Sequence, residues 1–186
     1  MAIDKVTSAS IATDAVGPTQ LNEASNYDFT GTVTGAGGVN TPAFLVGQTS
    51  NQTISNETWT LLSWDSEDFD IGSGFDLSNN KFVVPSGAAG KYHFTVWVTG
   101  NNTINYDRFH TAIWVNGSTP TFAGAGSRYT NHPYPNLGSG NFSGSNSFLY
   151  NASVGDYFEV KLYQDAGGDI VTNASRTWFY GYKIIE

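Results

Sequence analysis

The sequence predicts an all-β protein built as a sandwich or a barrel. Short runs of Val, Ile, Phe, Tyr, Trp and Thr alternate with polar residues in a period of two, and Gly, Asn, Asp, Ser or Pro bound each run. No window holds a sustained apolar period of 3.6 residues, so helices are not expected. Charged residues are only 13% of the chain, against about 25% in a typical soluble protein. Polarity without charge is typical of extracellular and virion β-structure.

Eight runs are predicted as strands, at 42–47, 57–62, 81–85, 90–100, 107–117, 145–151, 156–165 and 176–185. The run at 90–100 separates into two faces. One face carries Tyr92, Phe94, Val96 and Val98 and is predicted to be core, and the other carries His93, Thr95, Trp97 and Thr99. A solvent-facing side does not normally present a tryptophan, so Trp97 is expected to be covered by another surface. An isolated exposed tryptophan on a monomer is the alternative.

Two regions are expected, an N-terminal stem at 1–40 and a β head at 41–186. The stem is low in bulky apolar residues, and Ile11, Val16 and Leu21 recur every five residues. That spacing fits neither a helical stripe nor strict strand alternation, so the segment cannot bury itself as an isolated chain. Three copies wound around one axis would bury the row, which predicts a trimerising fibre segment. A disordered linker with accidental spacing is the alternative.

Several function classes are disfavoured by composition. The net charge is −8 and the few Lys and Arg are scattered, which argues against nucleic acid as a partner. The chain has no cysteine, and no run approaches the roughly 20 apolar residues of a membrane span. His93, His110 and His132 are too widely separated to form a recognisable metal motif. No GxSxG elbow or phosphate loop occurs, so we expect a protein that is not an enzyme and has no cofactor.

The densest charge is acidic and lies at 65–76. Two of its carboxylates could in principle serve a glycosidase, or several could hold Ca²⁺. The alternative is a solvated loop whose Asp side chains cap turns. The residues concerned are Asp65, Glu67, Asp68, Asp70 and Asp76.

The segments 69–76, 82–85, 90–94, 155–156 and 178–181 resemble the signature of the complement-type and tumour-necrosis-factor-like jelly-roll superfamily. The stem segments IATDAVGPTQLN and YDFTGTVTGAGG are similar to segments that lead into bacteriophage fibre tips. The jelly-roll resemblance covers 41–186. It implies a ten-strand jelly roll that assembles as a homotrimer, with its inner sheet toward the three-fold axis. It also allows a Ca²⁺ ion on that axis, as in some relatives.

The same resemblance implies the trimer interface. The residues expected to face the neighbouring subunits are His93, Thr95, Trp97, Phe179 and Gly181. Trp178, Tyr180 and Tyr182 are then expected to point into the sandwich.

A ligand is expected at loops on the end away from the stem. Alternate strand crossings place the loops near 48–51, 65–80, 101–105, 128–140 and 165–173 there. The segment SRYTNHPYPNLGSGN combines aromatic and polar side chains that suit stacking on sugar rings, and its prolines reduce the entropy lost on ordering. The predicted ligand-binding residues are Arg128, Tyr129, His132, Tyr134, Asn136 and Asn102. Packing of these aromatics against a neighbouring subunit, or over the mouth of a barrel, is the alternative.

These observations together predict a trimeric bacteriophage fibre tip that binds a host surface receptor, expected to be a glycan. It would be an extracellular part of the virion, joined to other tail or fibre proteins through its N-terminus. A purely structural spike or decoration is the main alternative, and a polysaccharide depolymerase is a third.

Overall fold

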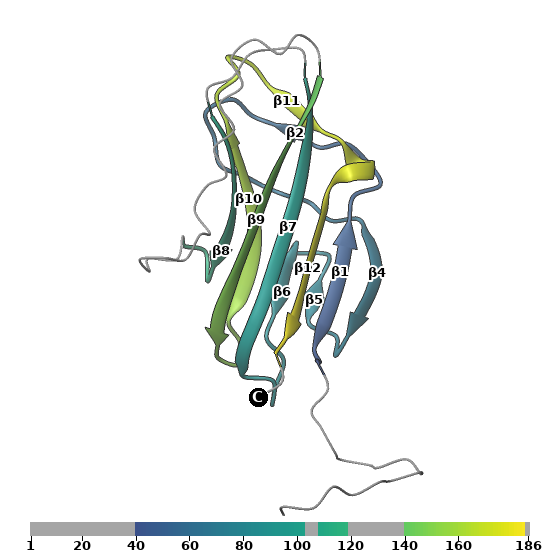
Figure 1. Cartoon of the computed structure of the whole chain (residues 1–186), viewed down its shortest axis with the longest axis vertical. Helices are drawn as coiled ribbons and strands as arrows, with labels where there is room; N and C mark the ends of the chain where they lie inside the picture. Colours follow the sequence, from purple (N-terminus) through teal and green to yellow (C-terminus); the bar gives the residue numbers. More distant parts are fainter. Residues whose placement is uncertain (1–39, 103–107, 119–139, 185–186) are drawn as a thin grey trace, which may run out of the picture. The chain divides into compact units, whose positions relative to one another are not determined.

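A computed structural model describes residues 40–102, 108–118 and 140–184, all within one unit of the chain, Gly38–Glu186. The stem predicted for 1–40 falls outside the described residues except for Asn40, so it stays a prediction. The described part is a sandwich of two antiparallel sheets, as predicted (Figure 1).

Sheet A has seven strands. Its long central strand β7 pairs with β9 on one side and with β12 and β11 on the other. Strand β12 pairs with β1, β1 pairs with β4 at the edge, and β11 pairs with β2. The bounds are β1 (Ala43–Gly47), β2 (Thr53–Ile54), β4 (Ser66–Ile71), β7 (Gly90–Asn102), β9 (Gly140–Ala152), β11 (Ile170–Thr172) and β12 (Trp178–Lys183).

Sheet B has five strands around β10, which pairs with β8 on one side and with β6 and β3 on the other. Strand β5 pairs with β6 at the edge. The bounds are β3 (Thr60–Leu61), β5 (Phe75–Asp76), β6 (Lys81–Val83), β8 (Phe109–Val115) and β10 (Tyr157–Gln164). A single 3-10 turn, η3 (Ala174–Arg176), precedes β12.

Aromatic rings fill the space between the sheets. Phe94 of β7 lies 4.2 Å from Phe158 of β10, and Phe44 of β1 stacks at 4.7 Å on Phe82 of β6 (centroid distances). The predicted core face of β7 is confirmed, since Tyr92, Phe94, Val96 and Val98 are all fully buried. Because side chains alternate between the two faces of a strand with a period of two, one face of each long strand lies in the core and the other lies outside.

Each of the eight predicted runs contains a strand, and the structure adds four strands that the pattern did not predict. These are β2, β4, β5 and β11, which bring the total among the described residues to twelve rather than ten. Strand β4 was missed because its sequence, SEDFDI, was interpreted as an acidic loop. It is an edge strand, and edge strands tolerate charge because one of their sides faces solvent.

The two ends of the sandwich carry different segments. At the Pro42 end, the N–H of Lys183 donates to the carbonyl of Pro42 at 3.0 Å, so the first and last described strands meet there (Figure 1). At the Thr172 end, the N–H of Gln52 donates to the Thr172 hydroxyl and Val171 pairs with Asn101. The described residues of three predicted far loops, 48–51, 101–105 and 165–173, therefore lie at the Thr172 end. The prediction that 65–80 is a far loop is wrong in part, because Gly72 lies against Pro42 at the opposite end.

Candidate functional site

Among the described residues, the outer face of sheet A, the side away from sheet B, is a surface that the other sheet does not cover. The pairing register arranges its outward side chains in three rows across β4, β1, β12, β7 and β9. From the Pro42 end, the rows are Ile71, Ala43, Tyr182, His93 and Leu149, then Phe69, Leu45, Tyr180, Thr95 and Ser147, then Ser66, Gly47, Trp178, Trp97 and Ser145.

A continuous band of rings runs along the middle of this face. Trp97 of β7 stacks on Trp178 of β12 with centroids 6.3 Å apart, and Trp178 stacks on Tyr180 at 5.6 Å. His93 then lies 6.2 Å from Tyr180 and 5.3 Å from Tyr182. Trp97 remains 39% exposed despite this stacking. Contiguous aromatic surface that is partly exposed is typical of interaction sites.

The predicted inward and outward sides of β12 are reversed in the structure. Phe179 is fully buried between the sheets and packs on Phe44 at 5.0 Å and on Trp64 at 5.9 Å. Gly181 also faces the core, where a side chain would collide with the ring of Phe94. The expectation that these two residues face a three-fold axis is therefore wrong.

Trp178, Tyr180 and Tyr182 lie on the outer face instead. Alternation makes them the outward set once Phe179 points inward. His93, Thr95 and Trp97 do lie on that face, so their role in a trimer interface stays a prediction.

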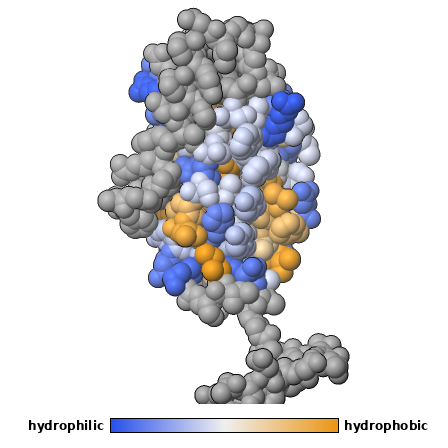
Figure 2. All heavy atoms as spheres, in the orientation of Figure 1, coloured by the Kyte–Doolittle hydropathy of each residue, from blue (hydrophilic) through white to orange (hydrophobic). Residues whose placement is uncertain are grey.

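Large apolar side chains stand exposed at both edges of the outer face. Leu149 on edge strand β9 is 63% exposed, and Phe69 and Ile71 on edge strand β4 are 43% and 53% exposed. Figure 2 shows two separate hydrophobic groups low on the molecule, one toward each side, with more hydrophilic residues between them. Sequence reasoning missed both edges, although the outward parity of Leu149 follows from its pairing with His93.

Short hydroxyl side chains join β7 to β9 on the same face. The Ser147 hydroxyl lies 3.0 Å from the Thr95 hydroxyl and 2.9 Å from His93 Nε2. The other ring nitrogen of His93, Nδ1, is buried and has no hydrogen-bond partner in the described part of the chain.

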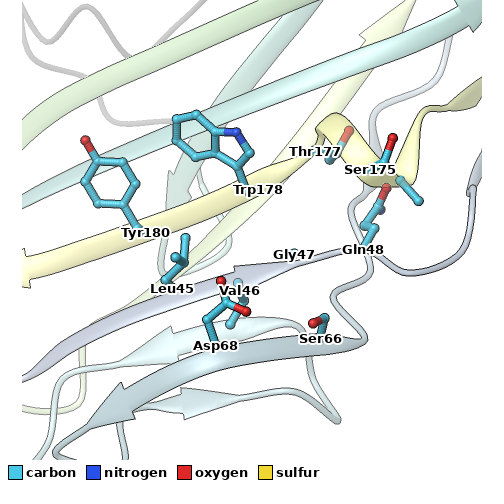
Figure 3. Close-up of a pocket in the computed structure, with 11 residues that line it drawn as sticks. Leu45, Val46, Gly47, Gln48, Ser66, Asp68, Ser175, Thr177, Trp178 and Tyr180 are labelled. Carbon is cyan, nitrogen blue, oxygen red and sulfur yellow. The ribbon is translucent and has the colours of Figure 1, made fainter.

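A groove opens on the outer face toward the Thr172 end (Figure 3). It has a volume of about 460 Å³, with β1 as its floor, β12 and η3 on one side and β4 on the other. Trp178 and Tyr180 lie side by side along one wall, and Asp68 lies across β1 on the opposite wall (Figure 3). The other lining residues are Leu45, Val46, Gly47, Gln48, Ser66, Ala174, Ser175 and Thr177.

The acidic stretch is mostly engaged in holding turns. The N–H groups of Gly74 and Phe75 donate to the Asp70 carboxylate at 3.1 and 2.9 Å. Hydrogen bonds from Ser78 and then Asn79 lower the pKa of Asp76 to about 2. The Asp65 carboxylate accepts from both the N–H and the hydroxyl of Thr49. The alternative interpretation of these carboxylates as turn caps thus describes three of the five.

Asp68 differs from Asp70 in the face that it occupies. Asp70 pairs with Phe44, whose ring lies in the core, whereas Asp68 lines the groove on the outer face. Asp68 and Asp70 therefore do not share one cleft, as the paired carboxylates of a glycosidase would.

Metal-binding groups are dispersed in the part of the chain that the structure describes. No group of three His, Cys, Asp or Glu side chains there is placed to hold an ion. His93 lies on β7 of sheet A and His110 on β8 of sheet B, while His132 is outside the described residues. A Ca²⁺ ion shared by three copies on an axis stays a prediction.

The predicted ligand loop lies outside the described residues, including Arg128, Tyr129, His132, Tyr134 and Asn136. The two strands that flank it end and begin at opposite ends of the sandwich. Strand β8 ends at the Pro42 end, where the N–H of Asn116 donates to the Tyr157 carbonyl, and β9 begins opposite Asn102 at the Thr172 end. Asn102 itself is the last residue of β7, as the prediction of a far-end position requires.

Comparison with known proteins identifies the fold of the chain. No family model matches the chain, and no curated protein matches it either. Among solved structures, the globular domain of zebrafish complement 1qA is similar with a TM-score of 0.52 and 15% identity, over 77% of this chain and 97% of that one. Murine APRIL at pH 8.0 is similar with a TM-score of 0.51 and 15% identity, over 76% and 98%. The fold is thus the jelly roll of the complement and tumour-necrosis-factor type, which confirms that part of the predicted resemblance.

Among the described residues, no helix has the length and apolar character needed to cross a bilayer.

Proposed function

We propose that the chain assembles as a homotrimer through the outer face of sheet A and acts as a receptor-binding fibre tip of a bacteriophage. The observation that best supports a homotrimer is the band of rings on this face together with the apolar side chains at its two edges. Those side chains are Phe69, Ile71 and Leu149, and each is more than 40% exposed in one chain. Burying exposed apolar surface against sister molecules is favourable by about 25 cal/mol per Å².

The location of the apolar edges favours a closed ring. Leu149 lies on β9 and Ile71 on β4, at opposite ends of one register row. A contact between the β9 edge of one copy and the β4 edge of the next joins two different surfaces. Such a head-to-tail contact generates a ring when its rotation closes. The jelly-roll resemblance implies that three copies close it.

The receptor role is supported by composition and by the stem. Neutral polar residues dominate the surface-forming positions, and charge is scarce. The stem segments at 11–22 and 27–38 are similar to segments leading into phage fibre tips. Three equal sites on one head raise avidity over a single weak site by a factor on the order of 100 or more, which suits recognition of repeated surface glycans.

Assembly is tested by light scattering on the purified chain and on a Trp97→Asp/Leu149→Asp variant. We expect the parent chain to have three times the 20.0 kDa mass of one chain and the variant to have the single-chain mass. Thr58→Asp, a change at an exposed loop position, serves as the control and is expected to leave the trimer intact. A parent chain that stays a single copy at high concentration contradicts the proposal.

Receptor binding is tested separately, by cell attachment and by a glycan array. Replacing Tyr129 and Tyr134 together by Ala is expected to abolish attachment while the mass stays that of the trimer. Unchanged attachment dismisses the loop as the receptor site. An empty array, together with infectivity after deletion of the tip, favours the structural spike instead.

A further inference from the structure

The outer face of sheet B carries a cluster of aromatic rings at the Thr172 end. Tyr163 belongs to the outward side of β10, because burial alternates along that strand. It pairs with His110 of β8, and the two rings stack with centroids 5.8 Å apart. The ring of Trp59, just before β3, lies 5.6 Å from Tyr163 and 6.3 Å from His110. All three residues are partly exposed, so the rings form an apolar floor that solvent reaches.

Arg108 is held in place beside this floor. Its guanidinium lies over the Tyr163 ring, 5.4 Å from the centroid, and its Nε donates to Asp165 Oδ2 at 2.6 Å. The Asp165 side chain is only 9% exposed, whereas that of Arg108 is 51% exposed. The two Nη atoms of Arg108 make no hydrogen bond with any described residue. A guanidinium fixed through Nε therefore presents its remaining N–H donors to solvent in one rigid plane.

Glu57 adds an acceptor next to these donors. It is exposed, and its φ of +54° lies in the left-handed region that residues other than glycine rarely adopt. Its N–H donates to the carbonyl of Gln164 at 2.7 Å, which ties it to the end of β10. The pKa of Arg108 is raised, mainly by the hydrogen bond to Asp165 and to a smaller extent by the charge of Glu57. The Glu57 carboxylate therefore lies near the guanidinium, on a strained backbone of the kind found at ligand sites.

We propose that this corner of sheet B binds one neutral pyranose unit of a glycan. The apolar face of the sugar packs on the rings of Trp59 and Tyr163, as aromatic side chains in ligand sites allow. Its hydroxyls accept hydrogen bonds from the Nη groups of Arg108 and donate to Glu57, because a hydroxyl both donates and accepts. Two carboxylates, those of Glu57 and Asp165, already lie near the one guanidinium, so a further anion is disfavoured.

The site is compatible with the proposed homotrimer. Assembly uses the outer face of sheet A, whereas Tyr163 belongs to sheet B, on the opposite side of the sandwich (Figure 1). All of the site residues come from one chain, so each copy in a trimer carries a complete site. The site is distinct from the predicted loop at 128–136. Its biological use rests on the proposed receptor role, but the binding itself does not.

The direct test is saturation-transfer NMR with the whole chain and three probes: the methyl β-glycosides of galactose, N-acetylglucosamine and glucuronic acid. We expect transfer to ring protons of at least one of the two neutral glycosides and little transfer to the glucuronide. A titration followed by NMR then gives the Kd. Absence of transfer to both neutral glycosides overturns the inference, and preferred binding of the glucuronide contradicts the neutral ligand.

A matched pair of glycine variants tests Glu57 without unfolding the chain. Glu57→Gly and Ser73→Gly each place glycine at an exposed position with a left-handed backbone, φ +54° and +53°, so neither should lower the Tm. Glu57→Gly should weaken glycoside binding about tenfold, the equivalent of one hydrogen bond to a charged group. Ser73→Gly, at the Pro42 end, should leave the Kd unchanged. Equal Kd values for the two variants contradict the role of Glu57.

A second pair tests the guanidinium. Arg108→Lys keeps the positive charge beside Asp165 but removes the planar set of donors, so binding should weaken about fivefold or more. Arg176→Lys makes the same change at an exposed arginine of η3, which lies outside the site, and should have no effect. Equal effects of the two changes contradict the assignment of Arg108.

The Trp97→Asp/Leu149→Asp variant separates this inference from the proposed trimer. Light scattering is expected to give it the single-chain mass, yet it should bind the neutral glycoside with the Kd of the parent. Loss of binding in this variant while it stays folded would show that the site needs the outer face of sheet A, which overturns the inference. A monomeric parent chain that binds the glycoside contradicts the proposed assembly and supports the site.

Discussion

Two glycines of neighbouring strands show how a single atom decides between core and surface. A Cβ at Gly181 would collide with the Phe94 ring and lie 2.9 Å from Cε1 of Phe44. We expect Gly181→Ala to lower the free energy of unfolding by about 1–3 kcal/mol, because it overpacks the core. Gly47→Ala, which meets only a carbonyl at 3.5 Å, should change it by less than about 0.5 kcal/mol. Urea denaturation of both variants checks this, and equal effects would contradict it.

Tyr92 gives the core a dependence on alkaline pH. Its hydroxyl donates to the Ala88 carbonyl at 2.6 Å, and burial raises the pKa of Tyr92 from 10.0 to about 12. Between those values the unfolded chain ionises this tyrosine while the folded chain keeps it neutral, so unfolding releases a proton and stability falls as pH rises from 10 to 12. Below pH 10 the contribution is constant.

The Tyr92→Phe variant isolates that effect. It should lose about 1 kcal/mol at pH 8 with the hydrogen bond to Ala88, and its stability should then decline less steeply above pH 10 than that of the parent. Chemical denaturation at pH 8, 10 and 11 measures both quantities. Parallel declines in the two proteins would show that Tyr92 is not the group responsible.

At the scale of elements, strand β4 depends on Asp70 for its turn into β5. The carboxylate accepts N–H groups from Gly74 and Phe75, so Asp70→Ala should lower the free energy of unfolding by about 2 kcal/mol. Glu67→Ala on the same strand is exposed and should stay within about 0.5 kcal/mol. Thermal unfolding compares the two. This matters for any activity assay, because a loss on mutating Asp70 would reflect folding and not catalysis.

Strands β12 and β7 show where sequence reasoning failed and where it succeeded. Period-two alternation predicted that β12 exists, but WFYGY carries aromatic residues on both sides, so hydrophobicity alone could not decide which side was inward. The family resemblance chose the wrong side for Phe179. By contrast, β7 has Thr95 and His93 opposing Phe94 and Val96, and its core face was predicted correctly.

The groove was missed for a related reason. Its walls come from β1, β4 and β12, which are distant in sequence. Strand pairing and the bulge that leaves Asp68 without a partner in β1 bring that carboxylate across β1 from Trp178 and Tyr180. Strand β4 was also unrecognised, because its acidic residues mimic a solvated loop. The sequence offered one signal for the groove. Trp178 and Tyr180 alternate in one predicted strand, and another predicted strand ends in Gly47.

For the whole molecule, assembly should make stability depend on concentration. If three chains fold and associate together, the unfolding midpoint rises with protein concentration by mass action. We expect calorimetry over a hundredfold concentration range to show that rise for the parent chain. The Trp97→Asp/Leu149→Asp variant should show a constant midpoint. A constant midpoint in both would mean that the outer face does not stabilise the fold through sister chains.

The pairing of Lys183 with Pro42 places entry and exit of the described unit next to each other. Units whose two ends lie together can be inserted into, or exchanged between, unrelated host chains with little disturbance. Genes encoding such a unit are therefore well suited to shuffling by recombination, with one β-sandwich unit replacing another in a common host chain. Grafting 41–184 onto a different trimeric stalk would reproduce that event in the laboratory.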